Sequence, residues 1–253
     1  MSTNAKLKIT ESTQEMLRCP VCQSSLALEN CQFECNNIQC RSYFPVVDGI
    51  PILINESGSI FSINQFLNYE NITLPLNTKS KFKQFIKDLL PDINVNVNSK
   101  VNYEKFLKLL IKQNETPKVL VVGGSEAGQG MEAILLTPSI ELIGSDVAFG
   151  SCTALICDAH DIPFHDGSFD GVIVQAVLEH VVDPNRCVEE FHRVLKENGL
   201  VYAETPFMQQ VHMGKYDFTR FTHLGHRRLF RKFEEICSGP ACGPGMALVW
   251  SYL

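Results

Sequence analysis

The sequence lacks several features that would set the class of the protein. It has no apolar run near the roughly 20 residues that a membrane-spanning helix needs. The first ten residues carry two lysines but no apolar stretch of signal-peptide length. Acidic residues outnumber basic ones, for a formal net charge of −6, so the chain as a whole does not attract nucleic acid or anionic membranes, although a local basic patch still can. We therefore expect a cytoplasmic protein without a membrane span.

The composition is that of an ordinary globular protein. Of the 253 residues, 45% are hydrophobic and 20% are charged, which supports a sizeable core and argues against disorder. This length accommodates one full α/β domain and a smaller module. No internal repeat is visible, and nothing in the pattern indicates an oligomeric state.

Half of the cysteines are concentrated in one short segment. Cys19 and Cys22 have two residues between them, Cys35 and Cys40 have four, and twelve residues separate the pairs. Four thiolates at such spacing satisfy tetrahedral Zn²⁺, and the metal would supply much of the folding free energy of so small a module. We expect a structural zinc site. The alternatives are reduced thiols without a metal, or Cys31 in place of Cys35.

From residue 117 onward, apolar β-branched runs alternate with helical patterns, which predicts a mostly parallel sheet. Strands are expected over 118–122, 140–144, 153–157, 171–175 and 200–204. Helices are expected over 79–90, 101–112 and 224–233, with a further helix around 188–195 that Asn198 and Gly199 close, and 94–98 is expected to be a loop.

These patterns divide the chain into three parts. We expect a zinc module over 1–54, a linker and helical segment over 55–116, and the main domain over 117–253. The pattern over 246–253 stops without a cap, so we expect the main domain to be truncated at its C-terminus.

A glycine-rich turn follows the strand at 118–122 and leads towards a helix. Glycine allows a ligand to approach the backbone closely, and a helix N-terminus offers free N–H groups. Asp146 ends the next strand, where a carboxylate can hold a ribose. A dinucleotide fingerprint would have glycine where Ser125 stands, which argues against a nicotinamide cofactor. A tight turn without any ligand is the alternative.

Four further motifs carry a family resemblance. They are CDAHDIPF at 157–164, SFDGVIV at 168–174, QAVLEHVVDP at 175–184 and LKENGLVY at 195–202. Together they resemble the methyltransferase type 11-like class I S-adenosylmethionine-dependent methyltransferases. The resemblance implies a Rossmann-like, doubly wound sheet of seven strands with helices on both faces. Residues 17–22 and 40–51 likewise resemble the zinc-ribbon module of the transfer-RNA-methyltransferase activator type.

The resemblance also implies a binding role for particular residues. The homocysteine part of S-adenosylmethionine would pass the glycine-rich turn, the ribose would meet Asp146 beside Val147, and the adenine would meet Asp158 and Ala159. Gln175 would border the methyl group. The turn residues concerned are Gly123, Gly124, Ser125 and Gly128.

Three positions qualify this interpretation. Val121 stands where the family often has an acidic residue, whose task would pass to Glu126 or to water, so a non-methylating member is an alternative. Glu179 and His180 are expected on the helix after the fourth strand, where a histidine more often packs than catalyses.

The acceptor pocket is expected in the loop over 205–222. His212 and Tyr216 are the candidate catalytic residues, with His212 as the base for a hydroxyl acceptor, unless they and Arg220 only tie the loop to the sheet. The basic helix that follows suits an acidic acceptor, although a solvated helix face is the commoner explanation. We expect methyl transfer to a small-molecule or glycan/lipid-precursor acceptor. The alternatives are an RNA methyltransferase whose ribbon binds RNA, and a cofactor-dead module that docks a partner protein.

Overall fold

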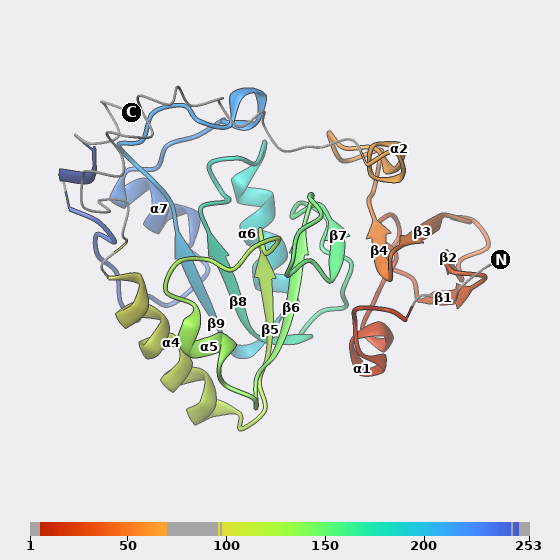
Figure 1. Ribbon diagram of the computed structural model, residues 1–253, viewed down its shortest axis with the longest axis horizontal. Helices are drawn as coiled ribbons and strands as arrows, with labels where there is room; N and C mark the ends of the chain where they lie inside the picture. The colour runs from red at the N-terminus through yellow and green to blue at the C-terminus, as the bar shows by residue number, and fades with distance from the viewer. Residues whose placement is uncertain (1–5, 70–95, 97, 244, 248–253) are drawn as a thin grey trace, which may run out of the picture.

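The computed structural model describes residues 6–69, 96, 98–243 and 245–247. The expected helix at 79–90, most of the segment at 94–98, and 248–253 lie outside the described residues. One sheet runs through the molecule in the order β1-β2-β3-β4-β7-β6-β5-β8-β9 (Figure 1). In the described part of the chain, no helix has the length and apolarity to cross a membrane.

The main domain is built on five parallel strands that confirm the five expected from the sequence. They are β5 (Lys118–Val122), β6 (Glu141–Asp146), β7 (Leu155–Cys157), β8 (Phe169–Gln175) and β9 (Leu195–Glu204). β5 and β8 are buried over nearly their whole length, as parallel strands covered on both faces must be. Because β5 lies between β6 and β8, the direction of winding reverses there, which is where open α/β sheets bind ligands.

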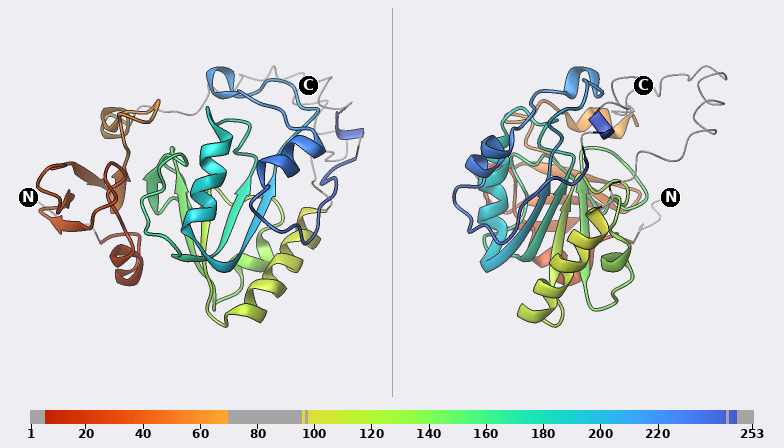
Figure 2. Two further views of the ribbon diagram at one scale, coloured as in Figure 1. Left: turned by 180° about the vertical axis from the view of Figure 1, so that it is seen from behind. Right: turned by 90° about the vertical axis from the view of Figure 1, so that its left-hand side faces the viewer.

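Helices cover both faces of this sheet (Figure 2). On one face α4 (Ser99–Gln113), which confirms the helix expected at 101–112, packs Tyr103 and Leu110 against β5 and β8. On the other face α6 (Pro184–Val194) buries Cys187 and Phe191 against alternate residues of the same strands. The architecture is therefore the expected Rossmann-like, doubly wound fold.

Several expected helices differ in extent from the structure. α6 ends at Val194 and β9 begins directly at Leu195, so Asn198 and Gly199 do not close the helix. Asn198 instead has a φ of 63° within β9, close to the irregular register between β8 and β9. α5 (Glu132–Leu135), after the glycine-rich turn, has only four residues, and α7 (His223–Leu229) ends before 233.

The turn between β8 and α6 also differs from the expectation. Residues 176–183 are not helical, so Glu179 and His180 do not lie on a helix. The reason is local: the Asp183 side chain accepts hydrogen bonds from the backbone N–H groups of Asn185 and Arg186, and Pro184 occupies the first helical position. This cap and proline start α6 at Pro184.

The N-terminal module is a small antiparallel sheet that joins the main one. After α1 (Glu11–Glu15) come β1 (Leu26–Glu29), β2 (Gln32–Cys35), β3 (Tyr43–Val47) and β4 (Ile50–Leu53). β4 pairs antiparallel with β3 and parallel with β7, so the last strand of the module extends the parallel sheet. Ile52 and Leu53 are completely buried there. Among the described residues the parallel sheet thus has six strands, where the resemblance implies a seven-stranded sheet, and none lies beyond β9.

Candidate functional site

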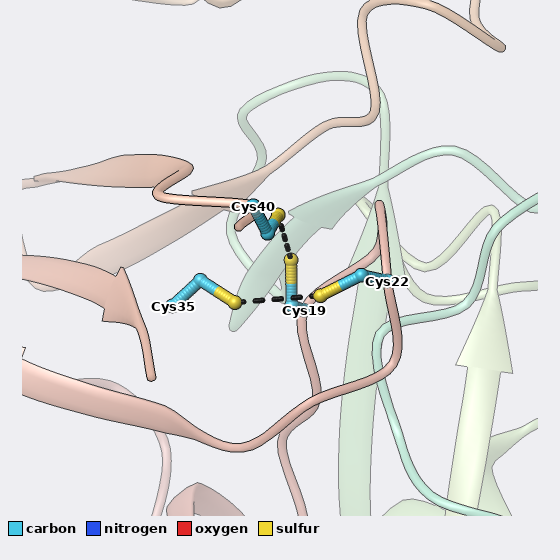
Figure 3. A group of neighbouring side chains, drawn as sticks. All are labelled: Cys19, Cys22, Cys35 and Cys40. Carbon is cyan, nitrogen blue, oxygen red and sulfur yellow. Dashed lines mark hydrogen bonds between the residues drawn. The ribbon is translucent and has the colours of Figure 1, made fainter. Parts of the chain in front are cut away.

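The four cysteines of the expected metal site come together in the N-terminal module (Figure 3). The Sγ atoms of Cys19 and Cys40 are 3.8 Å apart, those of Cys22 and Cys35 are 3.4 Å apart, and all four lie within 4.8 Å of one another. Zinc at about 2.3 Å from each sulfur requires neighbouring sulfurs to be about 3.8 Å apart. The four thiols therefore fit one Zn²⁺. Cys31 is exposed and outside this group.

Local turns explain how the unequal spacing is accommodated. The backbone N–H of Gln23 donates to the carbonyl of Cys19 at 2.8 Å, which closes the turn that holds the first pair of cysteines. After Cys35 the longer spacing forms its own turn, in which the Cys40 N–H donates to the carbonyl of Asn37 at 3.0 Å. The two additional residues are therefore absorbed by a turn and do not displace Cys40.

Asp146 lies at the end of β6 and ties the glycine-rich turn to the sheet. Its Oδ2 accepts the Ser125 N–H at 2.9 Å, and its Oδ1 accepts the Val147 N–H at 2.7 Å. Burial raises the pKa of Asp146 despite these hydrogen bonds. A carboxylate offers about four acceptor positions, and the Ser125 side chain and the Ala148 N–H also act on this one.

Asp158 follows β7, the neighbouring strand, and is almost fully buried. It accepts hydrogen bonds from Ser59 Oγ at 2.5 Å, and from the backbone N–H and Nδ1 of His160 at 3.0 and 2.5 Å. Burial opposes its charge, but the hydrogen bonds from His160 and Ser59 outweigh burial and lower the pKa of Asp158. Ser59 comes from the segment after β4, so the N-terminal part of the chain reaches this edge of the sheet.

Neighbouring atoms lie so close to the glycines of the turn that a residue with a side chain would not fit there. Gly123 has a φ of +72°, and a Cβ there would lie 2.2 Å from Cγ2 of Val177. A Cβ at Gly128 would lie 2.1 Å from Oε1 of Gln175. Gly124 packs against β5 and β6. The residues suit S-adenosylmethionine in kind, and Val177 and Gln175 lie against the turn that its methionine part would follow.

Gln175 belongs to a network that the sequence analysis missed. Its Nε2 donates to Oε2 of Glu204 at 2.7 Å, and its Oε1 accepts from the Tyr103 hydroxyl at 3.2 Å. Glu204 also accepts from Asn96 at 3.0 Å and from the hydroxyl of Tyr202. The signal for Glu204 was its place at the end of the fifth strand, beside Gln175 at the end of the fourth. This network fixes the orientation of the Gln175 amide.

The acceptor loop, residues 205–222, is organised by Asp217 and Arg220. The Arg220 guanidinium pairs with the Asp217 carboxylate and, together with the backbone N–H of His212, holds the pKa of that carboxyl well below its usual range. The His212 side chain remains 34% exposed, and its Nδ1 lies 3.1 Å from the carbonyl of Gln210. Tyr216 packs its ring against Phe61, with centroids 5.5 Å apart.

His212 also lies beside the turn between β8 and α6. Its ring meets that of His180 edge-on at 4.8 Å. Glu179, next to His180, is completely buried. The structure thus brings together two residues that the sequence placed on a helix and one that it placed in the acceptor loop.

Parts of this chain are similar to known methyltransferases. Residues 131–203 match the family model described as "Methyltransferase domain". A ubiquinone/menaquinone biosynthesis C-methyltransferase, UbiE, from Citrifermentans bemidjiense is 28% identical over 116 residues, which cover 39% of this chain and 49% of that protein. A demethylmenaquinone methyltransferase from Clavibacter sepedonicus is 46% identical over 44 residues, 17% of this chain and 18% of that protein. The chain therefore spans about half, or less, of the length of these relatives.

A solved structure described as "Complex between the Haloferax volcanii Trm112 methyltransferase activator and the putative methyltransferase" is also similar to this chain. It aligns with a TM-score of 0.39 and 22% identity, over 54% of this chain and 70% of that chain. The family match begins at Met131, directly after the glycine-rich turn, and ends within β9. Residues 131–203 are therefore similar to a methyltransferase domain, the strand order around β5 is Rossmann-like, and the module before them has four clustered cysteines, as expected of a zinc ribbon.

Proposed function

We propose that the chain is an S-adenosylmethionine-dependent methyltransferase with its cofactor at the carboxyl edge of β5, β6 and β8. The observation that supports this most directly is the position of two carboxylates. Asp146 and Asp158 follow neighbouring parallel strands, beside the glycine-rich turn that follows β5. Carboxylates at strand ends next to a winding reversal suit a nucleoside with two ribose hydroxyls and an amino group.

In this proposal each expected residue has one task. Asp146 accepts hydrogen bonds from the ribose, with Val147 beside it, and Asp158 and Ala159 border the adenine. The backbone of Gly123, Gly124, Ser125 and Gly128 lies along the methionine part. S-adenosylmethionine supplies an activated methyl group on a sulfonium, so the protein has chiefly to position the acceptor in line with it. Gln175, fixed by Glu204, limits the space in which the acceptor is held.

We further propose a small-molecule or glycan/lipid-precursor acceptor, held by the acceptor loop with His212 and Tyr216 beside it. Four apolar side chains of this loop are exposed: Phe207, Met208, Val211 and Phe218. The relatives, a ubiquinone/menaquinone biosynthesis C-methyltransferase and a demethylmenaquinone methyltransferase, support a small molecule over a nucleic acid. The net charge of −6 supports the same choice.

The N-terminal module is proposed to hold a structural Zn²⁺ on Cys19, Cys22, Cys35 and Cys40. We propose the same division of the chain as the sequence suggests: the module over 1–54, a connecting and helical segment over 55–116, and the catalytic domain over 117–253. In this division β4 belongs to the module although it pairs with β7.

Calorimetric titration with S-adenosylmethionine tests the proposed function. The unaltered chain is expected to bind one equivalent, and Asp146→Asn is expected to bind at least about tenfold more weakly, because a charged hydrogen bond contributes about 1.5–3 kcal/mol. Asp166→Asn is the matched control, because that carboxylate is 81% exposed and far along the chain from the glycine-rich turn. Absence of binding at millimolar ligand would overturn the proposal.

A further inference from the structure

Three side chains that can bind a metal lie together where the acceptor loop contacts the turn between β8 and α6. Glu179 and His180 come from the turn between β8 and α6, and His212 comes from the acceptor loop. One ligand atom from each lies within 4.8 Å of the other two. These residues are separate from the four cysteines of the N-terminal module.

The Glu179 carboxylate is the first observation that points to a ligand. Its side chain is completely buried, and neither of its oxygens has a hydrogen-bond partner among the described residues. A buried carboxylate without a partner is strongly unfavourable, so buried charges are normally paired or bind a metal. The positive charge of Arg220 favours the ionised form of Glu179. The Arg220 guanidinium is, however, already bound to Asp217 and to the carbonyls of Gln209 and Gln210.

The two histidines are oriented as metal ligands usually are. His180 Nδ1 lies 2.8 Å from the carbonyl oxygen of Tyr216. Because a carbonyl can only accept, Nδ1 carries the proton and Nε2 keeps a free lone pair, 3.7 Å from Oε1 of Glu179. That is close to the about 3.4 Å expected between two ligands that are each about 2.1 Å from one tetrahedral ion. His212 Nδ1 similarly faces the carbonyl of Gln210, which leaves its Nε2 available.

We propose that Glu179, His180 and His212 form a binding site for a divalent transition-metal ion. One carboxylate and two imidazoles suit Zn²⁺, Mn²⁺ or Fe²⁺, whereas Mg²⁺ and Ca²⁺ prefer oxygen ligands alone. The ion neutralises the buried carboxylate and fixes the acceptor loop to the turn before α6. His212 is 34% exposed, so the remaining coordination positions are open to water.

A role for the ion in methyl transfer rests on the proposed function. The site lies between the loop proposed to hold the acceptor and the turn that follows Gln175 at the end of β8. A metal ion lowers the pKa of a bound hydroxyl, so an acceptor oxygen on an open position would lose its proton to solvent water without a separate protein base. In that arrangement His212 contacts the ion through Nε2 and positions the acceptor indirectly.

The test is a titration of the full chain with Mn²⁺, after the module has been loaded with one equivalent of Zn²⁺. Thiolates prefer softer ions, so Mn²⁺ reports the second site. Electron paramagnetic resonance of free Mn²⁺ is expected to show one saturable site per chain. Glu179→Gln and His212→Asn are each expected to weaken binding at least about tenfold, as changes around metal sites typically do. His223→Asn, an exposed histidine on α7, is the matched control and is expected to bind normally.

The outcomes separate this site from the proposed function. Absence of saturable binding of Mn²⁺ and of a second Zn²⁺, or equal affinity in all variants, would overturn the metal site. Each sample is also titrated with S-adenosylmethionine. Normal cofactor binding without a second metal rejects this inference alone, whereas metal binding without cofactor binding rejects the proposed function alone. Glu179→Gln preserves the side-chain shape, and retained cofactor binding by that variant shows that its fold is intact.

Discussion

Alanine at position 123 tests how closely the turn between β8 and α6 approaches the glycine-rich turn. Gly123 has a φ of +72°, where an L-residue is disfavoured by about 1–2 kcal/mol. The new Cβ would also lie 2.2 Å from Cγ2 of Val177, and overpacking of this kind costs about 1–3 kcal/mol. Gly123→Ala is therefore expected to lower the free energy of unfolding by about 2–5 kcal/mol.

A second substitution separates the two contributions. Val177→Ala removes Cγ2, and the nearest remaining atom of that side chain, Cβ, is 3.6 Å from the added methyl group. In this background Gly123→Ala is expected to cost only the backbone part, about 1–2 kcal/mol. Urea unfolding of the unaltered chain, the two single variants and the double variant gives the coupling energy between positions 123 and 177 directly. An equal cost of Gly123→Ala in both backgrounds would refute the contact between Val177 and the turn.

The same pair of variants also bears on cofactor binding. Val177 lies over the turn along which the methionine part is proposed to pass, so its truncation is expected to leave S-adenosylmethionine affinity unchanged or tighter. Gly123→Ala adds a methyl group to that space and is expected to weaken binding. If Val177→Ala abolished binding in a folded protein, the proposed path of the cofactor would be wrong.

Three further outcomes are expected. By elemental analysis Cys19→Ser should contain about one zinc fewer per chain than the unaltered chain, since four cysteines hold one ion, with a lower melting temperature because metal binding drives folding of the module. Ile52→Ala, at a fully buried position of β4, should lower the free energy of unfolding by about 2–5 kcal/mol in a single cooperative urea transition, and an early separate transition would contradict the pairing of β4 with β7. For Asp170, burial raises the pKa, but hydrogen bonds from Asn114 and Lys196 outweigh burial and lower it. The ionised Asp170 carboxylate therefore stabilises the fold above the pKa that this carboxyl has in the unfolded chain, near 4. That stabilisation is lost as pH falls through the lower pKa of the folded state. Between pH 7 and pH 3, urea unfolding should show a larger decrease in the free energy of unfolding for the unaltered chain than for Asp170→Asn.

The strands were predictable because their signal is local. Each of the five parallel strands of the main domain coincides with a short β-branched apolar run, and their order places Asp146 and Asp158 at one edge without further information. The pairing of β4 with β7 is not local, since about a hundred residues separate Ile52 from its partner Ile156. No periodicity within Ile50–Leu53 indicates which sheet edge it will join.

The misplacement of Glu179 and His180 has a different cause, because the relevant signal was present in the sequence. Asp183 followed by Pro184 is an N-cap followed by proline at the first helical position, which starts a helix at Pro184 and leaves the preceding residues in a turn. The prediction placed both residues on the helix expected after the fourth strand and did not use that signal. The free carboxylate of Glu179 could not be predicted, since it depends on how Asp217 and Arg220 pair in a distant loop.

β4 connects the cysteine module to the proposed cofactor site through a short and continuous path. Because β4 runs parallel to β7, both strands end at the same edge of the sheet, and the chain leaving β4 must cross the region next to Asp158. Ser59 makes that connection directly, through its hydrogen bond to the Asp158 carboxylate. Phe61, two residues later, contacts Tyr216 of the acceptor loop. A module that served only to stabilise its own fold would not need its last strand in the parallel sheet. Its pairing there brings Ser59 to Asp158 and Phe61 to Tyr216, so we expect loss of the module to change the proposed site as well as stability.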